Sequence, residues 1–215
     1  MTNYSALSLL LAAACTGDLG KDKVDAVAEG AAASTEKTAQ EPAAAVPSSL
    51  EWSVDASQSK ISALGAKVVG KHPIDFHDYQ GNLRTNGDQV TSIRFEIQMA
   101  SLTTDHPKLQ QHLLNEDFFW VEQFPTASFE SAGVTAGSDQ EGMSHTISGD
   151  LTVRGVSQMV RFPASIQVTE DSVMARTEFV VNRQDFEITY PGKADNLVQD
   201  SVVLTIGLVA SPAAP

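Results

Sequence analysis

Hydrophobic and polar residues alternate along most of the chain that follows Leu50. In residues 92–99, Ile93, Phe95 and Ile97 occupy every second position, and polar side chains fill the positions between them. Successive side chains of a β-strand point to opposite faces, so this alternation predicts a strand with one buried and one exposed face.

The same period-two pattern returns in residues 146–153, 160–168, 173–181 and 202–208. Turn-forming pairs such as Gly87-Asp88 and Arg154-Gly155 stand between these runs. Many short strands are typical of a β-sandwich or a β-barrel. A long meander with one apolar face per strand favours an antiparallel barrel, because closure leaves no exposed sheet edge.

One segment interrupts the alternation and predicts a short helix. The Thr-Thr-Asp sequence at 103–105 offers capping oxygens, and Pro107 suits the first turn. Leu109 and Leu113 then fall on one face, and residues 115–117 end the helix.

Three consecutive aromatic residues, Phe118, Phe119 and Trp120, follow this helix directly. Because the helix interrupts a β domain, we expect the cluster where the chain crosses an edge of the barrel. Two roles stay open for the cluster: it caps an internal cavity, or it is a hydrophobic plug without ligand contact.

The first fifteen residues have a different character. Residues 6–14 are apolar except for Ser8, which is too short for a transmembrane helix and fits the hydrophobic region of a signal peptide. Ala12-Ala13-Ala14-Cys15 resembles a bacterial lipoprotein box, in which Cys15 becomes the acylated lipid anchor. The alternative is an ordinary signal peptide with an incidental cysteine.

Residues 16–49 are rich in Ala and contain no aromatic residue. Such a segment cannot bury enough apolar area to offset the entropy of ordering it, so we predict a disordered tether. The predicted organisation is therefore a signal peptide at 1–15, a tether at 16–49 and one β domain at 50–211. The expected location is outside the cytoplasm, in the bacterial periplasm or cell envelope, as a membrane-anchored lipoprotein.

Composition narrows the choice of partner. The formal net charge of -13 argues against nucleic acid, whose binding needs a basic surface. Cys15 is the only cysteine, so no intramolecular disulfide can form.

Six motifs between residues 50 and 211 resemble those of YceI-like proteins. Three are Trp-Ser-Val-Asp at 52–55, Phe-Pro-Thr-Ala-Ser-Phe at 124–129 and Gly-Asp-Leu-Thr-Val-Arg-Gly-Val at 149–156. The other three lie within 101–119, 182–186 and 190–200. Glu187 departs from the pattern, since the family often has Gly at this position.

The resemblance implies an extended, lipocalin-like antiparallel β-barrel of about eight strands with one short helix. It also implies a long apolar cavity that binds a polyisoprenoid or a similar long-chain amphiphile, without catalysis, metal or cofactor. Some members are homodimers, and both a monomer and a homodimer stay open for this chain.

The inward-facing apolar rows supply the residues expected to line such a cavity. These are Ile93, Phe95, Ile97, Phe129, Ile147, Leu151, Val160, Phe162, Ile166, Phe179, Val181, Leu204 and Ile206. Small residues at Gly149, Ala164 and Ala175 are expected to leave space between them. Arg154, Arg161, Arg183 and Lys193 are candidates for meeting an anionic head group or for ordinary ion pairs, with Asp185 among the partners.

Two alternative functions stay open. The first is an enzyme, hydrolytic or metal-dependent, that uses the His and Asp residues between His72 and Asp78. No Gly-x-Ser-x-Gly, phosphate-binding or dinucleotide-binding motif supports a particular reaction. The second alternative is a closed barrel without a ligand that serves as an interaction module.

Overall fold

The computed structural model describes residues 49–68, 70–194 and 196–213. The predicted signal peptide, Cys15 and all of the predicted tether except Ser49 lie outside these residues. The described residues contain no helix that is long and apolar enough to cross a membrane.

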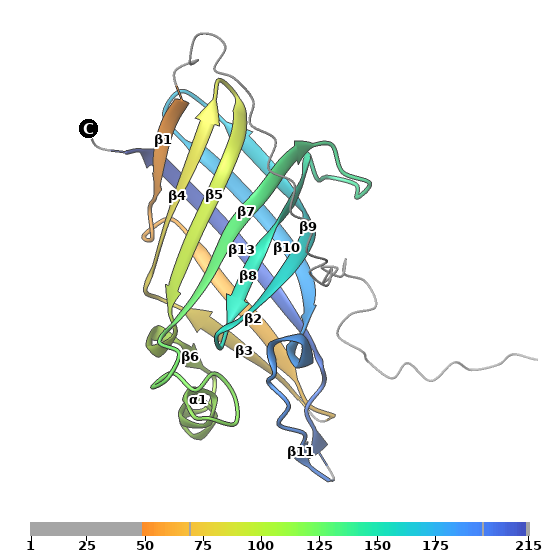
Figure 1. The fold of residues 1–215 in the computed structure, drawn as a ribbon. Coiled ribbons are helices and arrows are strands. Elements are labelled where there is room, and N and C mark those ends of the chain that lie inside the picture. The colour runs from red at the N-terminus through yellow and green to blue at the C-terminus, as the bar shows by residue number, and fades with distance from the viewer. Residues whose placement is uncertain (1–48, 69, 195, 214–215) are drawn as a thin grey trace, which may run out of the picture.

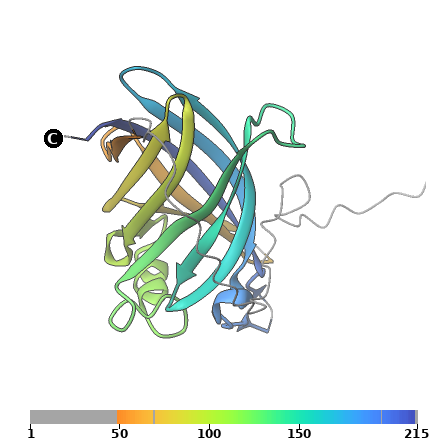
Figure 2. The ribbon, with the colours of Figure 1, turned by 45° about the horizontal axis from the view of Figure 1, so that its top comes forward.

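Eight antiparallel strands close into a barrel (Figures 1 and 2). The ring is closed because β1 pairs with β4 on one side and with β13 on the other. This confirms the predicted all-β barrel. In ring order the strands are β1 (Ser49–Val54), β4 (Tyr79–Asn86), β5 (Gln89–Gln98), β7 (Thr126–Ala136), β8 (His145–Val153), β9 (Val156–Val168), β10 (Val173–Asn182) and β13 (Ser201–Pro212).

A second set of strands extends the wall at the lower end of the barrel in Figure 1. β13 pairs with β1 through residues 210–212 and with β2 (Lys60–Ala66) through residues 203–207. β2 in turn pairs with β3 (Lys71–Phe76), and β3 pairs with β6 (Thr103–Thr104). The lower end therefore has a different set of strands from the upper end, where β1 pairs with β4.

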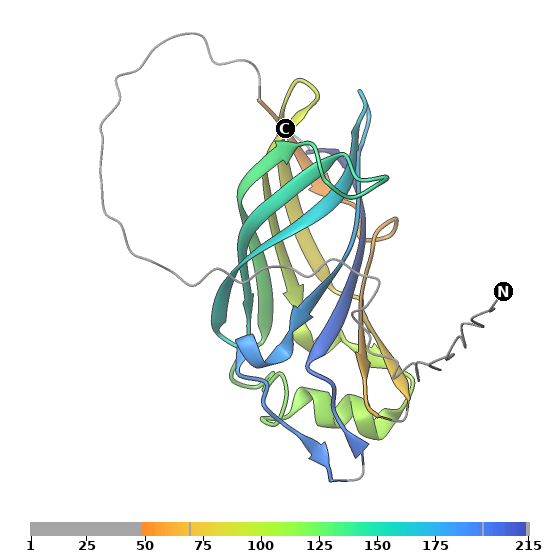
Figure 3. The ribbon, with the colours of Figure 1, turned by 90° about the vertical axis from the view of Figure 1, so that its right-hand side faces the viewer.

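Shorter elements complete the lower end of the barrel, as Figure 3 shows from the side. Within the described residues there are two 3-10 helices, η1 (Met99–Ser101) and η2 (Arg183–Phe186). A small hairpin joins β11 (Gly192–Lys193) to β12 (Asn196–Leu197). The α-helix, α1 (Pro107–Leu114), lies at the same end.

The position of α1 agrees with the predicted helix, but its predicted cap is wrong. The N-cap residue is His106, whose side chain makes no capping hydrogen bond. Thr103 and Thr104 form β6 instead, and the Asp105 carboxylate accepts hydrogen bonds from His72 and Thr104. These residues are used for tertiary contacts, which the local sequence pattern does not reveal.

The alternation of the sequence becomes a buried inner row in each strand. In β4 the buried residues are Tyr79, Gly81, Leu83 and Thr85, and the residues between them are exposed. Gly149 departs from the expected role of leaving space. A Cβ at Gly149 would lie 2.7 Å from Phe129 Cζ and 2.3 Å from the Glu130 carbonyl oxygen, so the Phe129 ring already fills that position.

Candidate functional site

The barrel encloses an internal cavity of about 230 Å³. Apolar side chains from the inner rows of the barrel strands make up most of its wall. The predicted residues found there are Ile93, Phe95, Ile97, Phe129, Ile147, Leu151, Val160, Phe162, Phe179, Val181, Leu204 and Ile206. Ala164 and Ala175, two of the three small residues expected to leave space, also line it.

Ile166 is the one residue of the predicted set that does not line the cavity. It is buried, with 9% of its surface exposed, and it pairs with Ala175 toward the upper end of β10. Its side chain therefore belongs to the hydrophobic core without lining the cavity.

A close-packed group of side chains fills the upper end of the barrel. Trp52, Thr85 and Val173 are almost completely buried, and none of them lines the cavity. The Trp52 indole N–H donates to Thr85 Oγ1 at 2.9 Å, which satisfies both polar groups inside the core. The cavity is thus closed toward β1 and extends toward the end that carries α1.

Aromatic rings form part of the cavity wall across neighbouring strands. The rings of Phe162 on β9 and Phe179 on β10 are stacked, with centroids 4.1 Å apart and an interplanar angle of 5°. The Phe129 ring lies 5.6 Å from the Phe162 ring. Such rings present large flat apolar surfaces to an occupant of the cavity.

The aromatic cluster after α1 divides into two parts. Phe118 and Phe119 line the cavity together with Leu109 and Leu113 of the helix. Trp120 does not line it, which differs from its predicted place in the cap. Its backbone has a φ of 47°, and its ring packs edge-on against Phe124 and lies under the Arg154 guanidinium.

An aromatic contact joins this cluster to the segment that follows η2. The His112 ring lies edge-on to both the Phe118 ring and the Tyr190 ring, at centroid distances of 4.9 Å and 4.8 Å. His112 Nε2 also pairs with the Asp117 carboxylate at 2.9 Å. The contacts of His112 therefore hold α1, the loop after it and the segment around Tyr190 together.

The basic residues of the cavity wall lie at the lower end. Lys67 at the end of β2 and His72 at the start of β3 both line the cavity, and both are half-buried. His72 Nδ1 lies 3.1 Å from the Asp105 carboxylate, and this hydrogen bond is the main reason that the pKa of Asp105 is lowered. The wall is therefore almost entirely apolar, and its basic side chains lie at the lower end.

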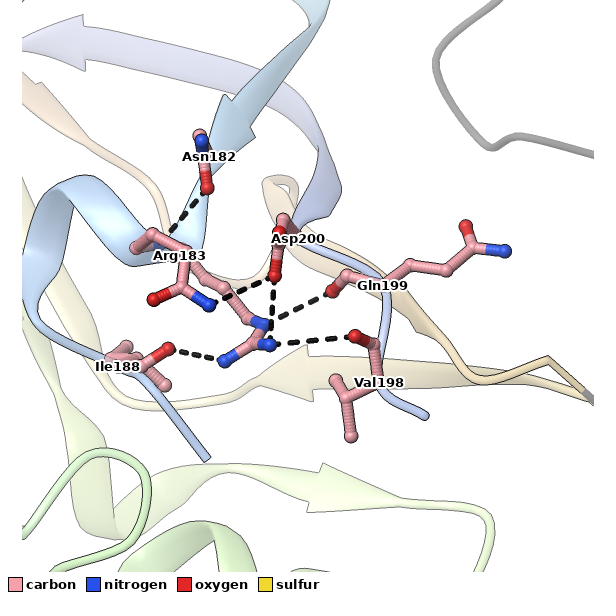
Figure 4. Close-up of polar contacts among 7 residues, drawn as sticks. Asn182, Arg183, Ile188, Val198, Gln199 and Asp200 are labelled. Carbon is pink, nitrogen blue, oxygen red and sulfur yellow. Dashed lines mark hydrogen bonds and ion pairs between the residues drawn. The ribbon is translucent and has the colours of Figure 1, made fainter. Parts of the chain in front are cut away.

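Arg183 also lines the cavity, but its guanidinium serves the fold (Figure 4). It donates hydrogen bonds to the carbonyl oxygens of Ile188, Val198 and Gln199. It also pairs with the Asp200 carboxylate at 2.8 Å, not with the expected Asp185. A side chain with this many partners fixes η2 against the start of β13 and is not available as a head-group ligand.

Glu187 ends η2 in the left-handed conformation, with a φ of 57°. The resemblance noted from the sequence led us to expect Gly here, and this backbone explains the expectation, since a side chain is strained in that region. We predict that Glu187→Gly stabilises the domain by about 0.5 kcal/mol, because relief of strain exceeds the added chain entropy. Urea denaturation measures the change, and the Arg154 bond to the residue 187 carbonyl is retained. A loss of stability contradicts this account of the turn.

The residues of the His72-to-Asp78 cluster do not converge on one point. His72 contacts Asp105, Asp75 pairs with Lys60, and His77 Nε2 lies 2.8 Å from Thr103 Oγ1. Among the described residues, no group of three or more His, Cys, Asp or Glu side chains is placed to hold a metal ion. The side chains of this cluster therefore form separate pairs near the surface, and one of them, His72, also lines the cavity.

Several cavity-wall residues were not among those predicted from the sequence. Ile61 and Ala63 of β2 and Ile74 and Phe76 of β3 all line the cavity. Their apolar residues also recur at every second position, so the alternation could have identified them. Lys67 and the helix residues Leu109 and Leu113 carry no such signal, because their place depends on how the lower end closes.

Comparison with known proteins agrees with this fold. Solved structures with the same architecture include BcnA of Burkholderia cenocepacia, with a TM-score of 0.66 and 20% identity over 74% of this chain and 99% of that chain. A domain from Saccharophagus degradans, described as polyisoprenoid-binding and implicated in plant cell wall breakdown, gives a TM-score of 0.61 at 16% identity over 76% of this chain and 99% of that chain. At these identities the likeness concerns the fold.

Relatives by sequence include a UPF0312 protein of Pseudomonas putida, which is 31% identical over 108 residues, 49% of this chain and 53% of that protein. A UPF0312 protein of Pseudomonas fluorescens is 26% identical over 153 residues, 67% of this chain and 77% of the relative. The chain thus spans about half the length of the first of these relatives. The family model of the YceI-like domain matches residues 52–210, which is most of the barrel. The chain therefore belongs to the YceI-like family.

Proposed function

We propose that the barrel binds a long-chain amphiphile, a polyisoprenoid or a similar lipid, and carries or sequesters it without chemical conversion. The observation that supports this most is the cavity, whose wall is almost entirely apolar and whose basic residues, Lys67, His72 and Arg183, lie at the lower end. The Saccharophagus degradans neighbour is described as polyisoprenoid-binding, which agrees with the proposal.

The physical basis of binding is burial of apolar chain. Each CH₂ group removed from water contributes about 0.8 kcal/mol, so an acyl or isoprenoid chain supplies affinity without any polar contact. The stacked Phe162 and Phe179 rings and the aliphatic rows of β8 and β13 would contact that chain. The polar end of the ligand would then lie beside Lys67 and His72.

The dependence of affinity on chain length tests this proposal. We predict that, for a series of fluorescent amphiphiles with one head group, affinity rises about fourfold per added CH₂ until the cavity is filled. Fluorescence titration below the critical micelle concentration measures the dissociation constants. An affinity that depends on the head group and not on chain length would contradict a cavity-binding function.

We further propose that the protein is exported and held at the membrane through an acylated Cys15. The sequence position of Cys15, directly after the apolar run at 6–14, supports this. Cys15→Ala in a bacterial host should move most of the protein from the membrane fraction to the soluble fraction. An unchanged distribution, with no lipid mass on the N-terminal peptide, would contradict the anchor.

A further inference from the structure

Two large apolar side chains are exposed on neighbouring segments at the lower end of the barrel. Val68, in the turn after β2, is 66% exposed, and Leu197 of β12 is 49% exposed. The Val68 N–H donates to the Leu197 carbonyl oxygen at 3.1 Å, so the β2–β3 turn and the β11–β12 hairpin are in direct contact. Figures 1 and 3 show both hairpins at the lower end of the barrel.

Lysines flank these apolar side chains in an otherwise acidic protein. Lys67 and Lys71 lie on either side of the β2–β3 turn. Lys193 lies on β11, which pairs with β12, the strand that carries Leu197. We define the tip patch as Val68 and Leu197 with Lys67, Lys71 and Lys193. Acidic residues of the same end include Asp105, which pairs with His72, and Glu116, Asp117 and Glu122 in the loop after α1.

Exposed aliphatic side chains ringed by lysines fit the interface of an anionic membrane. The aliphatic groups enter the acyl region while the ammonium groups remain at the phosphates. The net charge of -13 adds direction, because an anionic surface repels the body of the protein and attracts the lysines of the tip patch.

Lys67 belongs to both the tip patch and the cavity wall, so the two features are continuous. If the cavity takes a water-insoluble lipid, as proposed above, the ligand must pass between a membrane and the cavity, whose basic residues lie at its lower end. A patch suited to membrane contact lies at that end. Leu50, which is also exposed, lies on β1 at the opposite end.

We propose that the tip patch docks on an anionic lipid surface, with Val68 and Leu197 inserted and the lysines on phosphate groups. Docking places the charged end of the cavity against the membrane, and the lipid enters or leaves without crossing bulk water. This inference rests on the proposed function for its purpose, but docking itself is measured separately.

Depth-dependent fluorescence tests the docking. In the full chain with Cys15→Ser, Val68→Cys and the matched control Leu50→Cys each carry an environment-sensitive fluorophore. The vesicles contain equal parts of phosphatidylglycerol and phosphatidylcholine with brominated acyl chains as quencher. We expect quenching at position 68 that weakens with added salt and with pure phosphatidylcholine, and little quenching at position 50.

Charge variants supply the second measurement. Lys71→Gln and Lys193→Gln should each weaken partition onto the anionic vesicles about fivefold. Lys60→Gln is the control and should leave partition unchanged, because Lys60 pairs with Asp75 away from the tip. Equal quenching at positions 68 and 50, or no quenching at 68, overturns the inference. A concentration-dependent change at position 68 without vesicles assigns the patch to contact between copies of the chain and also overturns it.

Failure of docking and failure of the proposed function are distinguishable. The double variant Val68→Ser, Leu197→Ser should no longer dock on the vesicles, as measured by quenching. Its affinity for a soluble fluorescent amphiphile should be unchanged, since neither side chain lines the cavity. Loss of amphiphile binding in the unaltered chain with docking intact would remove the carrier function and leave the membrane contact.

Discussion

Ala164→Trp should eliminate lipid retention while the barrel stays folded. Ala164 on β9 is 1% exposed and lines the cavity, so a larger side chain at this position projects into the space proposed for the ligand chain. In a filled core such overpacking costs typically 1–3 kcal/mol, whereas empty space accepts the ring with little strain. We expect at least a tenfold loss of bound lipid after extraction and a melting temperature within a few degrees of the unaltered protein.

Ala210→Trp is the matched control for this variant. Ala210 on β13 is completely buried but does not line the cavity, because it lies with Trp52 and Val173 in the packed upper end. The same substitution should therefore destabilise the protein strongly. If Ala164→Trp is as destabilising as Ala210→Trp, the space at Ala164 is not available to a ligand.

Arg183→Met should lower the free energy of unfolding by about 3 kcal/mol. The substitution keeps an apolar stem of similar length but removes the donors to the carbonyl oxygens of Ile188, Val198 and Gln199. A buried acceptor left without a partner costs about 1–3 kcal/mol, and the Asp200 carboxylate also loses its cation. For a domain of this size the melting temperature should fall by roughly 6–12 °C.

Arg94→Met controls for the general effect of removing a guanidinium. Arg94 pairs with Glu130 at 2.6 Å, but their side chains are 70% and 62% exposed. Such pairs contribute about 0–1 kcal/mol, so the melting temperature should change little. Equal effects of the two substitutions would show that the contacts of Arg183 do not hold the lower end together.

The strands and most of the inner rows could be predicted from the sequence because alternation is a local property. Each of the five period-two segments corresponds to a strand, with Phe95, Phe162 and Phe179 on inner faces. The register between strands is not local. It places the Phe129 ring over Gly149 and leaves Ile166 out of the cavity wall, and neither result follows from the spacing within one strand.

The lower end was the least predictable part because long-range contacts decide it. Arg183 pairs with Asp200, seventeen residues later, although Asp185 is much nearer in sequence. Trp120 follows Phe118 and Phe119 in an unbroken aromatic run, yet its left-handed backbone turns its ring toward Phe124. The alternation also could not show that Lys67 and His72 would both line the cavity at its lower end.

Native mass spectrometry of the gently purified protein tests the central claim, that the cavity holds a long-chain lipid, most directly. The account predicts a fraction of molecules with an added mass of lipid size that is released by collisional activation. Ala164→Trp should lack this added mass, and Arg94→Met should retain it. An unaltered protein that carries no such mass, and that acquires none after incubation with bacterial lipid extract, would contradict the account.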